Sequence, residues 1–70
     1  MSWQTHLVRA WLHRSPEAEA KLLELARASR SVSSLAGRLH EEVRLEFYRV
    51  ILEGTEWDTL AQELAQVQDT

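Results

Sequence analysis

The chain has 70 residues, enough for one small domain that buries only about 60% of the surface its unfolded chain exposes. Its formal net charge is −3, so it lacks the basic excess of a dedicated nucleic-acid-binding protein. It contains no cysteine, which excludes disulfides, thiolate metal ligands and cysteine nucleophiles and favours an intracellular domain over a small secreted one.

The first predicted helix covers residues 3–13. Apolar side chains recur along it at helical spacing and share one face: Trp3, Leu7, Ala10 and Trp11. This helix is expected to end at Ser15-Pro16, because the residue before a proline is disfavoured in the α conformation. The same two residues predict the start of a second helix over 16–29, since serine caps free backbone amides and proline fits the first helical position.

The third predicted helix is the longest and covers residues 35–53. The serine-rich stretch 31–34 interrupts the preceding pattern, and Ser33 or Ser34 is expected to cap this helix. Gly54 is expected to end it in the left-handed conformation. A broad apolar arc predicts its core face: Leu35, Ala36, Leu39, Val43, Phe47, Val50 and Ile51.

A fourth helix is predicted over residues 56–67. Thr55 is its expected N-cap, and Asp58, three residues on, completes a variant of the capping box. The apolar face of this helix consists of Trp57, Leu60, Ala61, Leu64 and Val67.

Together these elements predict an all-α fold in a single domain over residues 1–70. We expect a small helical bundle of three main helices plus a short N-terminal helix. Because the link between the second and third helices is short, they are expected to form an antiparallel hairpin at the centre of the bundle. The fourth helix is expected to return across the third and to pack on its apolar arc.

The third predicted helix is apolar on a second side as well. Leu45, Tyr48 and Leu52 are spaced i, i+3 and i+7, outside the broad arc. One face of a bundle cannot bury both groups, so either the chain's other helices cover this stripe or it packs against another chain. A symmetric dimer, in which one patch pairs with itself, is one such solution. The first predicted helix offers a second candidate surface, consisting of Trp3, Leu7 and Trp11.

The sequence favours neither a metal site nor an enzyme. His6 and His13 lie ~10 Å apart along one helix, which is too far for one ion. Two glutamates follow His40, but neighbouring helical residues diverge by ~100° and do not share a face. No glycine-rich phosphate loop occurs, and so short a chain has little room for a ligand pocket. We therefore expect no catalytic residues, no cofactor, no metal and no small-molecule substrate.

The alternative function is that of a small helix-turn-helix regulator that binds nucleic acid. The second and third predicted helices would form this motif, with Arg27, Arg30 and Arg38 close to its turn. Two features argue against it: the turn contains no glycine, and acidic residues that would face phosphates follow along the third helix. These acidic residues are Glu41, Glu42 and Glu46.

The leading prediction is a non-enzymatic protein–protein interaction module, an adaptor or regulator that acts by helix–helix packing as a homodimer or with another protein. Its predicted interface residues are Leu45, Tyr48 and Leu52, followed by the three of the first helix. No apolar run approaches the ~20 residues of a membrane span, and the N-terminus lacks the pattern of a signal peptide. We therefore expect a cytoplasmic protein without a membrane partner.

Overall fold

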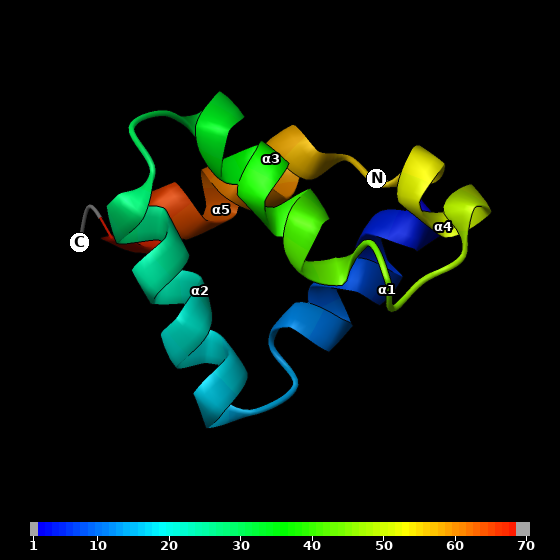
Figure 1. Ribbon diagram of the computed structural model, residues 1–70, viewed down its shortest axis with the longest axis horizontal. Coiled ribbons are helices and arrows are strands. Elements are labelled where there is room, and N and C mark those ends of the chain that lie inside the picture. The colour runs from blue at the N-terminus through cyan, green and yellow to red at the C-terminus, as the bar shows by residue number, and fades with distance from the viewer. Residues whose placement is uncertain (1, 69–70) are drawn as a thin grey trace.

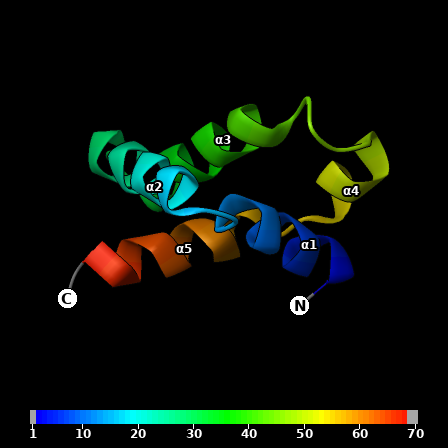
Figure 2. The same ribbon diagram turned by 90° about the horizontal axis from the view of Figure 1, so that it is seen from below.

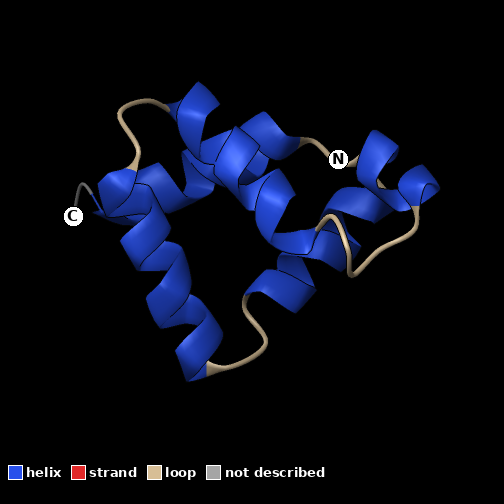
Figure 3. Cartoon of the chain, in the orientation of Figure 1, coloured by secondary structure: helices blue, strands red, loops and turns tan. Residues whose placement is uncertain are grey.

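The computed structural model describes residues 2–68, and every regular element within them is a helix (Figures 1 and 3). In chain order the helices are α1 (Trp3–Leu12), α2 (Pro16–Ala28), α3 (Val32–Val43), α4 (Arg49–Gly54) and α5 (Trp57–Gln68). Figure 2 shows two layers, with α2 and α3 on one side of α1 and α5, and with α4 at the end that carries α1. The predicted small all-α bundle is confirmed.

The hydrophobic core is centred on α3 and α5, which make the most extensive helix–helix contact in the described chain. In Figure 2, α5 lies beneath the layer formed by α2 and α3. The buried apolar residues are Val8, Leu12, Leu22, Leu35, Ala36, Leu39, Val43, Leu60, Ala61 and Leu64. Since full burial of a valine or leucine side chain is worth about 1.5–3 kcal/mol, this cluster supplies most of the favourable free energy of folding. The side chain of Val67, predicted on the same face of α5, lies outside the described residues.

The helix starts follow local serine signals. Ser15 accepts a hydrogen bond from the backbone N–H of Ala18 at 3.1 Å, and Pro16 occupies the first turn of α2, as predicted. The cap of α3 is Ser31, whose hydroxyl oxygen accepts from the backbone N–H of Ser34 at 3.1 Å. The prediction of Ser33 or Ser34 as this cap is therefore wrong. The helix begins at Val32, because Ser31 already satisfies an otherwise free amide.

The predicted hairpin is present, but it is not the main contact of the bundle. Helices α2 and α3 run in opposite directions in Figure 1 and are joined by Ser29–Ser31. An ion pair between Lys21 and Glu42, 2.9 Å from nitrogen to oxygen, links the two helices. Because α3 packs more extensively on α5 than on α2, α5 rather than the hairpin partner covers its apolar arc.

The prediction of one continuous helix over 35–53 is wrong. Helix α3 ends at Val43, a tight turn follows in which the backbone N–H of Glu46 donates to the carbonyl oxygen of Val43 at 2.9 Å, and Tyr48 is extended. The ring of Phe47 packs edge-on against Trp11, with 5.9 Å between centroids. Tertiary packing thus overrides the helical spacing: the break turns α4 towards α1 and brings Phe47, Ile51 and Leu52 against the core.

Two predictions near the end of this segment also need correction. No described residue has a positive φ, and Gly54 is the last residue of α4, so it is not a left-handed helix terminus. Thr55 does not cap the last helix: its hydroxyl donates to the carbonyl oxygen of Ile51 at 2.7 Å, and α5 begins only at Trp57. Val50, predicted in the core, is exposed, because the break rotates α4 relative to α3.

Candidate interaction surface

Helices α1 and α4 lie side by side in a defined register. The side chain of Gln4 is so close to Gly54 that a Cβ at position 54 would overlap it. At the other end of α1, Trp11 meets Phe47, the second residue before α4. These two contacts make α1 and the segment 47–54 antiparallel neighbours. In the sequence, Leu7 falls between Gln4 and Trp11, and Val50 falls between Phe47 and Gly54.

Exposed apolar side chains gather on these elements. The large hydrophobic side chains that are exposed within the described chain are Trp3 (61% exposed), Leu7 (41%), Leu45 (81%), Tyr48 (82%) and Val50 (62%). All five belong to α1, to α4 or to the turn that leads into α4. We call this set the α1–α4 surface. Among the residues whose side chains are described, α2, α3 and α5 contribute no exposed large hydrophobic group, so this apolar exposure lies at the end of the molecule that carries α1 and α4.

The predicted stripe Leu45, Tyr48 and Leu52 does not exist as a helical face. Leu45 lies in the turn after α3 and Tyr48 at the N-terminus of α4, where both are exposed. Leu52 is half-buried against the core, and its carbonyl oxygen accepts a hydrogen bond from the indole Nε1 of Trp57 at 3.2 Å. Leu52 is therefore a structural residue.

The second predicted set, on α1, is divided in the same way. Trp3 and Leu7 are exposed. Trp11 is half-buried, with Phe47 against its ring and the guanidinium carbon of Arg14 3.7 Å from its ring centroid. The exposed residues of the two predicted sets are Trp3 and Leu7 in one and Leu45 and Tyr48 in the other, and the fold brings all four to one end of the molecule. Sequence reasoning missed Val50, which is exposed only because the helix breaks before it.

Opposite charges flank Val50 on α4. Arg49 and Glu53 are one helical turn apart, with 3.6 Å between the guanidinium and carboxylate atoms, and they are 90% and 69% exposed. A groove of about 540 Å³ adjoins this part of α4. Its lining residues are His40, Arg44, Phe47, Arg49, Leu52 and Glu53. The short helix therefore projects charged and apolar groups beside a concave surface.

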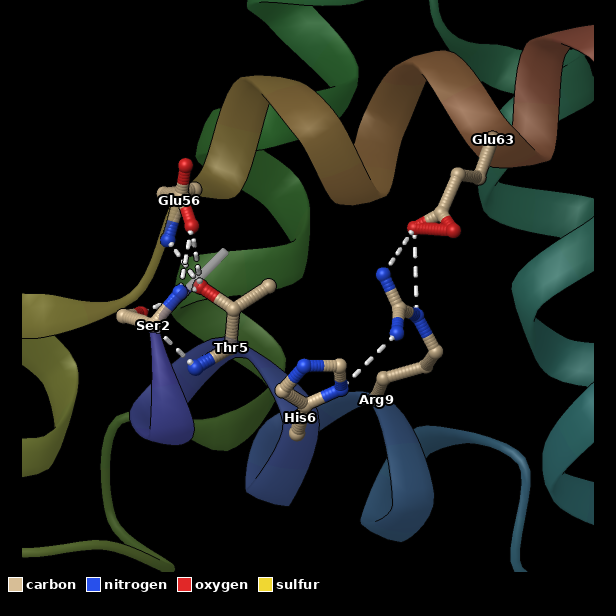
Figure 4. A network of polar contacts seen from close by, with 6 residues as sticks. All are labelled: Ser2, Thr5, His6, Arg9, Glu56 and Glu63. Carbon is tan, nitrogen blue, oxygen red and sulfur yellow. Dashed lines mark hydrogen bonds and ion pairs between the residues drawn. The ribbon is translucent and has the colours of Figure 1, made fainter.

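A polar joint holds the N-terminus of α1 against the connection between α4 and α5 (Figure 4). The Ser2 hydroxyl donates to the carbonyl oxygen of Gly54 at 2.6 Å, and the buried Thr5 hydroxyl accepts from the backbone N–H of Glu56 at 2.8 Å. The single Thr5 hydroxyl proton is shared between Ser2 Oγ, at 2.8 Å, and the Glu56 carboxylate, at 3.2 Å. This joint fixes the orientation of α1, and so of Trp3 and Leu7, without using their side chains.

The Glu56 carboxylate is the electrostatic centre of this joint. The backbone N–H of Ser2 donates to it at 2.9 Å and is the main cause that lowers the pKa of Glu56, while the Thr5 hydroxyl lowers it further. A second charged contact lies further along α1 in Figure 4: Arg9 binds Oε1 of Glu63 through two nitrogens, at 2.8 and 3.1 Å. Together these contacts attach α1 to Glu56, the residue directly before α5, and to Glu63, two turns further along.

The predicted nucleic-acid residues lie on the other side of the bundle, around the α2–α3 connection. Arg27 is near the end of α2, Arg30 is in the connection and Arg38 is on α3. All three side chains are exposed, and none has a carboxylate partner among residues 2–68. The groove beside this connection is lined mainly by small and apolar residues: Ala26, Ser29, Arg30, Ser31, Val32, Leu35 and Ala65.

Comparison of the chain with protein-family models, with curated proteins and with solved structures finds no match. Within the described chain, no helix combines the length and apolar character needed to cross a bilayer. The described residues also contain no group of three or more histidine, aspartate or glutamate side chains placed to hold a metal ion.

Proposed function

We propose that this protein is a non-enzymatic interaction module, an adaptor or regulator, that binds through the α1–α4 surface and has a second copy of itself as its first partner. The observation that supports this proposal is that the five large hydrophobic side chains exposed among the described residues all lie on α1, α4 and the turn between α3 and α4. Monomeric proteins rarely expose large contiguous apolar patches, and such patches mark interaction sites. Tryptophan and tyrosine, here Trp3 and Tyr48, are also the residue types enriched among binding hot spots.

The energetics favour association. Burying each aliphatic side chain of this surface is worth up to about 1.5–3 kcal/mol before the cost of ordering it. A domain of this length has a total stability near the low end of about 5–15 kcal/mol. Association through several of these side chains would therefore stabilise the fold substantially, and the unfolding midpoint would rise with protein concentration.

The test is the mass of the full chain in solution, measured by light scattering on a sizing column over a range of loading concentrations. We expect twice the monomer mass at high concentration and dissociation on dilution. Tyr48→Glu should weaken the dimer because it places a charge among apolar groups, while Ala20→Glu, on an exposed position of α2, adds the same charge elsewhere and should not. A monomeric mass at every concentration would contradict self-association.

A second candidate function, nucleic-acid binding, is favoured by one observation. Arg27, Arg30 and Arg38 are exposed without a carboxylate partner in the described structure, whereas Arg9, Lys21, Arg44 and Arg49 each pair with a glutamate. Titration of duplex DNA at several salt concentrations tests it, because each phosphate contact contributes about −0.9 to the slope of log affinity against log salt. Replacing the three arginines by alanine should remove that slope. Absence of binding by the unmodified chain at low salt would contradict this candidate.

A further inference from the structure

We propose that two copies of the chain pair around a two-fold axis with their α4 helices antiparallel, so that Arg49 of each copy meets Glu53 of the partner subunit. This inference rests on the proposed self-association and adds the arrangement and the residues that determine its specificity. It is carried by the order of charges on α4, by their exposure and by the shape of the surface around them.

The order of charges on α4 is self-complementary only in one orientation. Arg49 and Glu53 form a row along the helix with the positive charge nearer its N-terminus. When two such rows run antiparallel, each positive charge faces a negative one, whereas parallel rows would place like charges together. Pairing position 49 with position 53 centres the two-fold axis at the level of Ile51. The exposed Val50 side chains of both copies then lie close to the axis.

The two charged groups are available for this role. Both are largely exposed, and their contact within the chain, at 3.6 Å, is longer than the 2.8–2.9 Å of the other carboxylate pairs of arginine and lysine in the described residues. Exposed pairs of this kind contribute little to the stability of a monomer. Exchanging the partner within the chain for one in the second copy therefore costs little.

The surface around α4 fits a two-fold pairing in shape and size. In each copy the exposed side chains of Tyr48 and Val50 form a projection. Beside it lies a groove of about 540 Å³, lined in part by Phe47 and Leu52. A symmetric contact sets the projection of one copy against the groove of the other, twice. Aromatic side chains contribute about 150–250 Å² each when buried, so Trp3 and Tyr48 with the three aliphatic residues supply most of the ~800 Å² that one partner of a standard interface buries.

A charge exchange tests the arrangement in the full chain. Arg49→Glu places glutamate opposite glutamate at both symmetric contacts, and Glu53→Arg places arginine opposite arginine. Each single variant should dimerise about tenfold more weakly than the unmodified chain at low salt, and less so at high salt. An equal mixture of the two variants restores both contacts between unlike copies. We expect this mixture to form a heterodimer close to the original affinity, as should the double variant R49E/E53R as a homodimer.

Each single variant carries a like-charged pair within its own α4, and this pair could weaken the dimer by destabilising the helix. Two variants that had merely lost their fold would not regain dimer affinity when mixed, so the mixture distinguishes this effect from a loss of the contacts between copies. Circular dichroism of each variant alone checks that helicity is retained. A dimer whose affinity does not respond to either substitution overturns this arrangement, and so does a pair of weak variants that fail to recover when mixed. If the unmodified chain is monomeric at every concentration, the proposed self-association itself has failed. That result differs from the two outcomes above, in which a dimer forms but not in the proposed arrangement.

Discussion

The half of the molecule formed by α2, α3 and α5 buries five of its seven leucines, whereas the half formed by α1, α4 and the turn before α4 leaves five large hydrophobic side chains exposed. The helices of the two halves are also held in place by different kinds of contact. Helices α3 and α5 meet through side chains such as Leu39 and Ala61, both fully buried. Helix α1 buries Val8 and Leu12 in the core. At its N-terminus it is held by polar contacts as well, because hydrogen bonds of Ser2 and Thr5 reach Gly54 and Glu56.

This difference indicates a division of labour in a very small domain. A polar joint can fix the direction of a helix because hydrogen bonds are directional, and it does so without using up apolar area. The exposed apolar side chains of α1 and α4, which are Trp3, Leu7 and Val50, then remain available for a partner, while α3 and α5 contribute most of the buried apolar residues.

The largest contrast is expected between two leucines of opposite burial. Leu39→Ala removes a side chain that is fully buried between α3 and its neighbours and should lower the free energy of unfolding by about 2–5 kcal/mol. Leu45→Ala, at an exposed position, should change the stability of the monomer by less than about 0.5 kcal/mol and should instead weaken association. Urea unfolding at low protein concentration measures the first effect, and sizing measures the second. Equal losses of stability would contradict the division between the two halves.

The next effect concerns the polar joint. Thr5→Val keeps the shape of a fully buried side chain but removes the hydroxyl that accepts from the backbone N–H of Glu56 at 2.8 Å. An N–H left without a partner costs about 1–3 kcal/mol, so urea unfolding should show a loss of that size. Thr59→Val is the matched control, because the Thr59 hydroxyl has no hydrogen bond within the described residues. If both variants lose the same stability, the joint contributes nothing specific.

The elements that could be predicted from the sequence are those with local signals. Ser15 and Pro16 are adjacent and specify a helix start by themselves, and the leucine spacing of the last helix predicts Leu60 and Leu64 as core residues. The break after Val43 has no such signal, because the residues before it are good helix formers and the apolar spacing continues through it.

What ends α3 is a contact with a distant part of the chain, and that information is not local. Phe47 packs on Trp11, which a periodicity argument cannot foresee. The one available hint is compositional: Phe47, Tyr48, Val50 and Ile51 are all residues that lose side-chain freedom in a helix. Because this break was missed, the interface prediction contained the exposed Leu45 and Tyr48 but placed them on a helical face with the half-buried Leu52.

The two glycines give a smaller effect of opposite sign in the two halves. Gly54→Ala places a methyl group on the side chain of Gln4 and should destabilise the α1–α4 contact by about 1 kcal/mol or more. Gly37→Ala, in the middle of α3, meets nothing within 4 Å and should stabilise the helix by about 0.5–1 kcal/mol, since alanine loses less backbone freedom. Thermal unfolding of the two variants measures the signs. Stabilisation by Gly54→Ala would show that the flexible side chain of Gln4 moves aside at little cost.

The smallest effect is a pH dependence that belongs to the polar joint alone. Hydrogen bonds from the backbone of Ser2 and the hydroxyl of Thr5 lower the pKa of Glu56, so the unfolded chain binds this proton more readily than the folded one. The resulting stabilisation is complete above the ordinary glutamate pKa and is lost as the pH falls through the lowered pKa of the folded state.

Glu56→Gln should therefore be less stable than the unmodified chain at neutral pH and should approach it in acid. Glu24→Gln controls for the loss of one carboxylate, because Glu24 makes no hydrogen bond within the described chain. A difference between Glu56→Gln and the unmodified chain that stays constant from neutral to acidic pH would mean that the Glu56 side chain contributes through its shape, and that the charge at this joint does not hold α1 in place.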